Sequence, residues 1–268
     1  RGGSDFSAAI LAHVLEANSL EIWTDVSGMF TANPKLVTQA KPIPKLSYLE
    51  AMELSHFGAK VLYPPTIQPV MTKNIPVIIK NTFSKKDKGT LISNNSSYKS
   101  IIKGITHIKN ISLLTIEGSG MIGIPGYLKK LFEEISNNNI NIIMITQASS
   151  EHSICIAINE SDSINAKKII DEAFKYEIEN SILSPSKIES KLSIIALVGD
   201  NMRDHQGISG KMFSALGKNN INVKAISQGS SERNITAVIK NNDVKKALNT
   251  LHEKFFEKNV KQINLFII

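Results

Sequence analysis

The first 92 residues combine two hydrophobic patterns, one with the period of a helix and one typical of buried strands. In residues 6–17, apolar side chains recur every three or four positions, which predicts a helix capped by Ser4 or Asp5. Residues 20–24 and 75–80 are short apolar runs of the kind found in buried strands. Strands that alternate with helices predict a layered α/β fold.

A second helix between those strands carries both a start and a stop signal. Ser47 and Glu50 have the spacing of a capping box, in which each side chain bonds the backbone N–H of the other residue. Gly58 suits the left-handed position that follows the end of a helix. A polar, charged stretch with few large apolar residues comes after the second strand and predicts a boundary. We therefore expect an N-terminal unit at residues 1–92, followed at 93–110 by a linker and the first strand of the next region.

From residue 111 onward the chain is an internal repeat with an offset of 81 residues. Residues 112–158 align with residues 193–239 without a gap, and 17 of the 47 aligned positions are identical. Each copy has the pattern strand, glycine-containing loop, helix, strand, turn, strand and helix, which is the order of a ferredoxin-like βαββαβ unit. So long a period indicates two duplicated small domains rather than a solenoid. We call them the first repeat, residues 111–190, and the second repeat, residues 191–268.

Each repeat carries the same polar cluster. A glycine stands where the helix should begin, an asparagine opens the second strand, and Gln-x-Ser-Ser-Glu follows at the end of that strand. A helix start offers free N–H groups and a partial positive charge to a carboxylate, and side-chain oxygens can accept from an ammonium group. The cluster therefore suits a zwitterion such as an amino acid, whereas a helix cap with a polar turn would explain a single copy. Its members are Gly126, Asn141, Gln147, Ser150 and Glu151 in the first repeat and Gly207, Asn222, Gln228, Ser231 and Glu232 in the second.

Composition narrows the classes of function. The 268 residues carry a net charge of +7, but no Arg-rich run and no alternation of basic and aromatic residues is present, so we expect no nucleic-acid partner. No apolar run reaches the ~18 residues of a membrane span, so we expect no membrane partner. The six histidines share no ligand spacing with one another or with the single cysteine, Cys155, so we expect no metal site. One cysteine excludes an internal disulfide, which fits a cytoplasmic protein.

Three segments of the N-terminal unit resemble the aspartate kinase family. RGGSDFSAAI, at the start of the chain, is similar to the family's G-R-G-G-S-D motif. EIWTDVSGMFTANPK, residues 21–35, resembles its E-I-W-T-D-V-x-G-[IV]-Y-T-x-D-P-R segment. LSYLEAMELSHFGAKVLYPPTI, residues 46–67, resembles its S-Y-x-E-A-x-E-L-x-x-x-G-A-K-V-L-H-P segment. The duplicated region resembles the paired ACT domains of the same family, which bind amino acids, so the resemblance covers essentially the whole chain.

This resemblance implies a fold and an activity. The expected fold class is α/β: the C-terminal part of an amino-acid-kinase α/β/α sandwich, followed by two ferredoxin-like βαββαβ (ACT) domains. The expected activity is phosphorylation of the side-chain carboxylate of L-aspartate by ATP with Mg²⁺, under feedback control by an amino acid. The Gln-x-Ser-Ser-Glu form is similar to that of threonine-sensitive bifunctional aspartokinase/homoserine dehydrogenases, which favours threonine as the effector. In this family the ACT units pair between chains, so we expect a homo-oligomer.

The motifs also imply roles for individual residues. The catalytic role falls to Arg1 and Asp5, and contact with the substrate to Arg1, Gly2, Gly3 and Ser4. Contact with ATP falls to Thr24, Asp25, Phe30, Lys35, Lys60 and Val61. Effector contacts in the first repeat fall to Met121, Gly126, Tyr127, Leu128, Asn141, Gln147, Ser150 and Glu151. Those in the second fall to Met202, Gly207, Ile208, Asn222, Gln228, Ser231 and Glu232. Because the loops before Gly126 and Gly207 differ, we expect the two effector sites to be non-equivalent.

The chain also resembles a piece of a longer family member. The family's K-F-G-G-T-S segment, whose lysine stabilises the transferring phosphoryl group, would precede Arg1, so we expect this chain to be inactive alone. The last residues, 264–268, have a buried-strand pattern that in the bifunctional enzymes continues toward a Gly-rich motif. We therefore expect any dehydrogenase half, with its NADP site, to lie beyond Ile268.

Other interpretations remain open at this point. Phe30, Asn33, Lys35 and Tyr63 stand where the family has Tyr, Asp, Arg and His, which favours as an alternative a decayed kinase whose ACT pair only senses an amino acid. A monofunctional, lysine-sensitive aspartokinase is a second alternative. A kinase of glutamate or acetylglutamate is disfavoured by the E-I-W-T-D-V segment and the two ACT copies.

Overall fold

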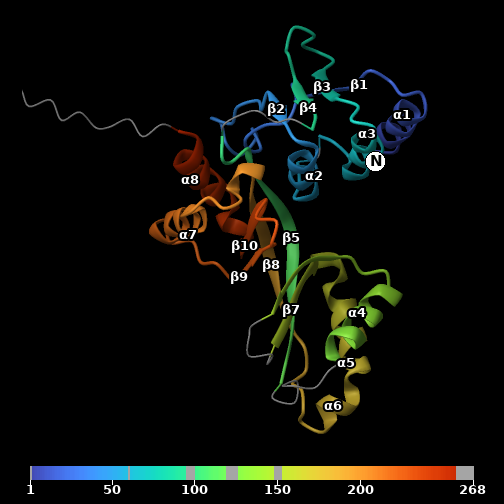
Figure 1. Ribbon diagram of the computed structural model, residues 1–268. Coiled ribbons are helices and arrows are strands. Elements are labelled where there is room, and N and C mark those ends of the chain that lie inside the picture. Colours follow the sequence, from blue (N-terminus) through green and yellow to red (C-terminus); the bar gives the residue numbers. More distant parts are fainter. Residues whose placement is uncertain (1, 60, 95–99, 119–125, 148–152, 258–268) are drawn as a thin grey trace, which may run out of the picture.

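The computed structural model describes residues 2–59, 61–94, 100–118, 126–147 and 153–257. The N-terminal unit sits at one end of a long six-stranded sheet, and the helices of the first repeat lie at the opposite end (Figure 1). None of the helices in these ranges is long and apolar enough to cross a membrane. The predicted α/β fold class is confirmed.

The N-terminal unit contains a four-stranded sheet with helices packed against it. Its elements are α1 (Gly3–Val14), β1 (Leu20–Thr24), β2 (Lys45–Leu46), α2 (Tyr48–His56), a 3-10 turn (Pro64–Thr66), α3 (Ile67–Thr72), β3 (Val77–Asn81) and β4 (Thr90–Ile92). The strands follow the order β1-β3-β4-β2. β1 and β3 are parallel, with Thr24 opposite Asn81 at their carboxyl ends, whereas β3 and β4 are antiparallel.

The local signals in this unit are confirmed, with one correction. β1 has the predicted bounds, Ser47 and Glu50 form the complete capping box, and Gly58 has a φ of 111°. The predicted cap of α1 is wrong, because Gly2 occupies that position with a φ of 93° and no side chain caps the helix. Tyr63 lies against this glycine, where an added Cβ would come within 2.5 Å of the tyrosine Cβ. The left-handed backbone and the close contact both require glycine, so the helix begins ahead of the predicted caps.

Both repeats contribute to one antiparallel sheet. Two long strands, β5 (Gly104–Glu117) and β8 (Lys187–Val198), form its centre. The first repeat adds α4 (Tyr127–Asn137), β6 (Ile142–Gln147), β7 (Ser153–Asn159), α5 (Ser163–Ala173) and α6 (Lys175–Glu179). The second adds α7 (Ile208–Lys218), β9 (Ala225–Gln228), β10 (Asn234–Lys240) and α8 (Val244–Phe256). The strand order is β6-β7-β5-β8-β10-β9.

The strand β5 serves both repeats. From Ile111 onward it pairs with β7 and with the first half of β8, which completes a βαββαβ unit for the first repeat. Its earlier half, Gly104–Ile108, pairs with the segment Ile194–Val198 of β8 and so fills the fourth-strand position of the second repeat. The second repeat therefore takes its outer strand from a segment that precedes the first repeat. The repeat alignment begins only at Ser112 and contains no copy of this segment.

The N-terminal unit shares a hydrophobic core with the second repeat. Leu197 of β8 and Leu248 of α8 belong to a buried cluster that also contains Ala32 and Val37 of the N-terminal unit. The first repeat has a separate core between its helices and its side of the sheet. Packing therefore joins the N-terminal unit to the second repeat more closely than to the first.

Candidate active site and effector sites

The expected substrate residues form the start of α1. Gly2 precedes the helix, and Gly3, Ser4 and Asp5 make up its first turn, with Ser4 Oγ donating to the Asp5 carboxylate at 3.3 Å. Gly3 and Ser4 are exposed. The free N–H groups and the partial positive charge of this helix start are thus accessible to an anionic ligand. Arg1 lies outside the described residues.

Thr24 and Asp25 lie where two parallel strands end. The hydroxyl of Thr24 donates to the Asp25 carboxylate at 3.1 Å, and its carbonyl accepts from the backbone N–H of Thr82 at 2.8 Å. Ligands of α/β sheets bind outside the carboxyl ends of parallel strands, so this edge is a candidate nucleotide site. Val61 is half-buried against the core of the N-terminal unit, and Lys60 lies outside the described residues.

The other two predicted nucleotide residues, Phe30 and Lys35, flank a contact with the second repeat. Phe30 is half-buried and Lys35 is exposed. Between them, the Thr31 hydroxyl lies 2.9 Å from Nε2 of His252 in α8. Ala32, also between them, and Val37, two residues beyond Lys35, belong to the shared core. The predicted nucleotide segment therefore continues directly into the junction with the regulatory sheet.

Each helix start in the repeats has the expected glycine. Gly126 and Gly207 precede α4 and α7 with φ values of 112° and 84°. No atom of the described residues lies within 4 Å of an added Cβ at either glycine, so none of these residues crowds the two helix starts. Asn141 directly precedes β6, Asn222 lies three residues ahead of β9, and both are exposed. Gln147 is the last residue of β6.

In the second repeat, two members of the polar cluster form hydrogen bonds to the start of α7 and to the loop before it. Ser209, in the first turn of α7, donates to Oε1 of Gln228 at 3.4 Å, which links the helix start to the end of β9. Glu232 accepts from the backbone N–H of Asp204 at 2.7 Å, so its carboxylate holds the loop before α7. The residue of the first repeat that aligns with Ser209 is Leu128, which has no side-chain donor. The hydrogen bond between Ser209 and Gln228 therefore has no counterpart at the aligned position of the first repeat.

The remaining effector predictions differ in burial. Met202 and Ile208 are 3% and 4% exposed within the core of the second repeat, so their side chains face the core rather than solvent. Tyr127 stacks on Phe174 with ring centroids 5.9 Å apart and packs against the core of the first repeat. Ser231 is half-buried. The residues outside the described ranges are Met121, Ser150 and Glu151.

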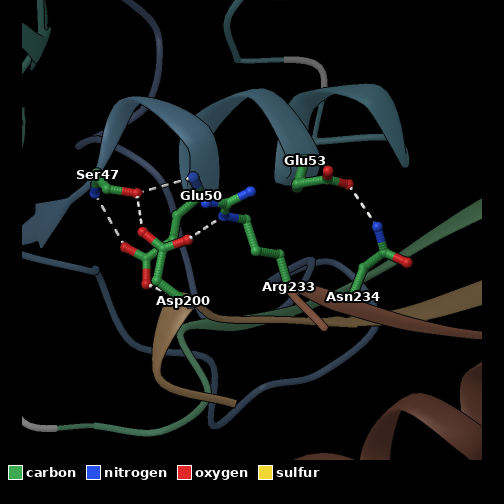
Figure 2. Close-up of polar contacts among 6 residues, drawn as sticks. All are labelled: Ser47, Glu50, Glu53, Asp200, Arg233 and Asn234. Carbon is green, nitrogen blue, oxygen red and sulfur yellow. Dashed lines mark hydrogen bonds and ion pairs between the residues drawn. The ribbon is translucent and has the colours of Figure 1, made fainter. Parts of the chain in front are cut away.

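A polar network joins α2 to the second repeat (Figure 2). Glu50 is fully buried, and its two carboxylate oxygens accept from the backbone N–H groups of Ser47 and Asp200, each at 2.9 Å. The Ser47 hydroxyl donates to Oδ2 of Asp200 at 2.5 Å. Nε of Arg233 donates to the other oxygen, Oδ1, of Asp200 at 2.9 Å. The capping box of α2 is thus also a docking point for the second repeat.

The network contacts both ends of the second polar cluster. Asp200 stands in the loop that leads from β8 to Gly207, and Arg233 directly follows the turn that contains Glu232. Beside it, Asn234 donates to the Glu53 carboxylate of α2 at 2.8 Å (Figure 2). A ligand that moves either the loop or the turn would therefore act directly on α2.

Burial dominates the electrostatics of the network. It raises the pKa of the Glu50 carboxyl above its ordinary value, while the N–H donors of Ser47 and Asp200 and the charge of Lys103 lower it. Lys103 is itself only 2% exposed. A buried carboxylate is expensive to leave without its partners, so the contact between α2 and the loop is costly to break.

The sequence patterns did not predict this network, although the sequence contains one sign of it. The second repeat has Asp200 and Arg233 where the first repeat has Ser119 and His152. Opposite charges gained in one copy of a duplicated domain indicate a contact that only this copy makes. The part played by Glu50 left no further sign, because its helix-capping role explains it fully.

Family models match both parts of the chain. A model described as the amino acid kinase family matches residues 1–81, and one described as the ACT domain matches residues 114–174 and 195–255. The chain therefore combines part of an amino acid kinase with a pair of ACT domains.

Individual relatives narrow the class. The bifunctional aspartokinase/homoserine dehydrogenase of Haemophilus influenzae is 43% identical over the whole chain, which covers 33% of that relative. The lysine-sensitive aspartokinase 3 of Escherichia coli is 31% identical over 96% of the chain, which covers 56% of it. The crystal structure of E. coli aspartokinase III in complex with aspartate and ADP matches with a TM-score of 0.83 and 29% identity, over 96% of this chain and 56% of that one. The chain belongs to the aspartokinase family and spans about a third of the length of its bifunctional relatives.

Proposed function

We propose that the full-length protein is an aspartokinase, which transfers the γ-phosphoryl group of ATP to the side-chain carboxylate of L-aspartate. The observation that carries this proposal is the position of the family motifs. Two of them lie at the exposed start of α1 and at the carboxyl end of β1, beside the parallel strand β3, on a fold similar to that of an aspartokinase bound to aspartate and ADP.

The proposed chemistry asks the protein for position and charge. The substrate carboxylate, with a pKa near ~4, is already ionised at neutral pH and needs no general base. Charge stabilisation and alignment then supply the catalysis. The helix start at Gly2–Asp5 offers N–H donors to an anionic group, Arg1 offers its guanidinium to the substrate, and Thr24 and Asp25 face the nucleotide. Mg²⁺ arrives with ATP as part of the substrate; among the described residues no His, Cys, Asp and Glu cluster forms a resident metal site.

We propose that an amino acid regulates this activity by binding at the polar clusters. The helix starts at Gly126 and Gly207, which no described residue crowds, supply N–H donors for its carboxylate. Gln147 and Gln228 supply amide groups that can pair with a hydroxyl, which favours threonine. Lysine is the alternative, supported by the similarity to the lysine-sensitive aspartokinase 3. A binding titration with threonine, lysine and methionine distinguishes them.

Three further proposals concern the whole protein. The match to a bifunctional relative along the whole chain supports an additional homoserine dehydrogenase half that uses NADP. Ile145 and Ile226 occupy matching positions on the edge strands β6 and β9, and each is 45% exposed. Such apolar edges support a homo-oligomer formed through the ACT domains. We place the protein in the cytoplasm.

The test is aspartate-dependent release of ADP by the full-length protein with Mg²⁺. We expect turnover that requires aspartate and falls when the effector is added. A folded protein that binds the effector but does not turn over would favour a sensing module instead.

A further inference from the structure

The loop between β3 and β4, residues 82–89, belongs to the same edge of the sheet as Thr24 and Asp25. It leaves β3 at Asn81, which lies directly opposite Thr24 in the parallel pair. The backbone N–H of Thr82 donates to the Thr24 carbonyl at 2.8 Å. Figure 1 shows this loop projecting beyond the sheet on the side away from the repeats. No family motif recognised in the sequence includes it.

The base of this loop is firmly attached to the predicted nucleotide segment. Ser27 donates to the Asp87 carboxylate at 2.5 Å and accepts from the Asn81 amide at 2.9 Å. Gly89 packs so closely on β3 that an added Cβ would lie 1.9 Å from the Ile79 carbonyl oxygen. Side-chain bonds and backbone packing therefore hold the loop in one position beside the nucleotide segment.

The outer part of the loop carries groups that suit a nucleotide. The Phe83 side chain is 86% exposed, although its backbone N–H is fixed by a 2.9 Å bond to Asn81 Oδ1. Lys85, Lys86 and Lys88 are exposed as well. The one acidic residue of the loop, Asp87, accepts a hydrogen bond from Ser27, and the three lysines exceed its single negative charge, so the loop keeps a net positive charge. An exposed aromatic ring offers a face for base stacking, and ammonium groups attract phosphates.

We propose that the loop 82–89 forms one wall of the nucleotide site, with Phe83 stacking on the base and Lys85, Lys86 and Lys88 holding the polyphosphate. The proposal rests on the proposed function, because it takes the site at Thr24 and Asp25 to be a nucleotide site. It assigns binding to residues that sequence motifs leave out. Because Phe83 is assigned to the base and the three lysines to the polyphosphate, the two contacts can be tested separately.

The experiment measures binding of Mg·ATP and of inorganic tripolyphosphate to the full-length protein by calorimetry. Phe83→Ala should weaken ATP binding about tenfold, since stacking on an aromatic side chain contributes about 1–3 kcal/mol per base, and should leave tripolyphosphate binding unchanged. Phe83→Tyr, which keeps the ring, should bind ATP as the unsubstituted protein does. A triple variant, Lys85→Gln with Lys86→Gln and Lys88→Gln, should weaken both ligands.

Matched controls come from the repeats. Tyr176→Ala removes another exposed aromatic ring, and a triple variant of Lys168, Lys245 and Lys246 to Gln removes as much exposed positive charge. Neither should change ATP binding. The inference would be overturned if the Phe83→Ala and loop-lysine variants both bound ATP as tightly as the unsubstituted protein. An unsubstituted protein that binds no ATP would overturn both this inference and the proposed function. One that binds ATP without aspartate turnover would overturn the proposed function alone.

Discussion

The two repeats share one fold but have different neighbours. The second repeat shares a core with the N-terminal unit and reaches α2 through Asp200, Arg233 and Asn234. Among the described residues of the first repeat, no side chain makes a comparable polar contact with that unit, and its helices lie at the far end of the sheet (Figure 1). One copy of a duplicated domain thus makes the polar contacts with the N-terminal unit, while the other meets that unit through a buried apolar cluster that includes Phe57 and Leu113. The same kind of substitution should therefore have different consequences in the two copies.

The largest effect is expected from Glu50→Ala. This substitution leaves the backbone N–H groups of Ser47 and Asp200 without their acceptor inside the interface, so the free energy of unfolding should fall by about 3 kcal/mol. Urea unfolding followed by the fluorescence of Trp23, the single tryptophan of the chain, measures it. The control Glu133→Ala, an exposed site on α4 of the first repeat, should change stability by less than about 0.5 kcal/mol. If Glu50→Ala and Glu133→Ala lowered the free energy of unfolding equally, the buried contacts of Glu50 would not contribute more to stability than an exposed site does.

The next effect concerns the effector and compares Gln147→Ala with Gln228→Ala. Gln147→Ala should raise the half-inhibiting effector concentration about tenfold, the loss of about one good hydrogen bond, with uninhibited turnover nearly unchanged. Gln228→Ala should have a smaller effect, since Gln228 is already engaged by Ser209. Inhibition assays on the full-length variants measure both. Unchanged inhibition in both variants would mean that the clusters are structural turns.

A smaller effect is expected from Arg233→Gln, which removes the ion pair with Asp200. The two side chains are 35% and 27% exposed, so the pair should contribute about 1 kcal/mol to communication between the repeat and α2. The half-inhibiting effector concentration should rise about fivefold. Lys187→Gln, which breaks the pair with Glu117 on the opposite half of the sheet, is the control and should leave inhibition unchanged. If Lys187→Gln raised the half-inhibiting effector concentration more than Arg233→Gln, the contact between the second repeat and α2 would have no special role in inhibition.

The smallest effect is a pH dependence at His252, where the second repeat meets Thr31. Burial lowers the pKa of this imidazole below its ordinary value of 6.5. Below that pH the unfolded chain takes up a proton that the folded chain resists, so acidification from pH 7.5 to 5.5 should reduce stability. The loss should be smaller in His252→Gln, as measured by urea midpoints at the two pH values. If the unsubstituted protein and His252→Gln lost stability equally on acidification, groups other than His252 would be responsible for the loss.

Sequence patterns predicted those features whose causes lie within a few residues. The capping box of Ser47 and Glu50 and the left-handed Gly58 are local, and the structure has both. The glycines before α4 and α7 were equally predictable, because a gapless repeat places them at equivalent helix starts. Whether the polar residues around them bind an effector remains a prediction.

Features that join distant segments left little trace in the pattern. The pairing of Gly104 with Val198 has no local signature, so the shared strand was not foreseen. The second role of Glu50 depends on Asp200, 150 residues later in the chain. The predicted cap of α1 was wrong, and the residue that does precede the helix, Gly2, has a neighbour far along the chain, Tyr63, that leaves no room for a side chain there.

The shared strand β5 gives the regulatory region the architecture of a hairpin with a long excursion. Ile111 of β5 lies beside Leu192 of β8, and everything between them belongs to the first repeat. Because these neighbours are antiparallel, a short turn could join them and leave the second repeat with its four strands intact. Excision of the first repeat would thus preserve this strand order but uncover Ile194, Ala196 and Val238, which lie in a buried cluster with residues of the first repeat. Removal of the second repeat would take away the strand that pairs with Gly104–Ile108 and the contacts with the N-terminal unit. A replacement for the first repeat would therefore need only a matching apolar face and two strand ends that join Ile111 and Leu192.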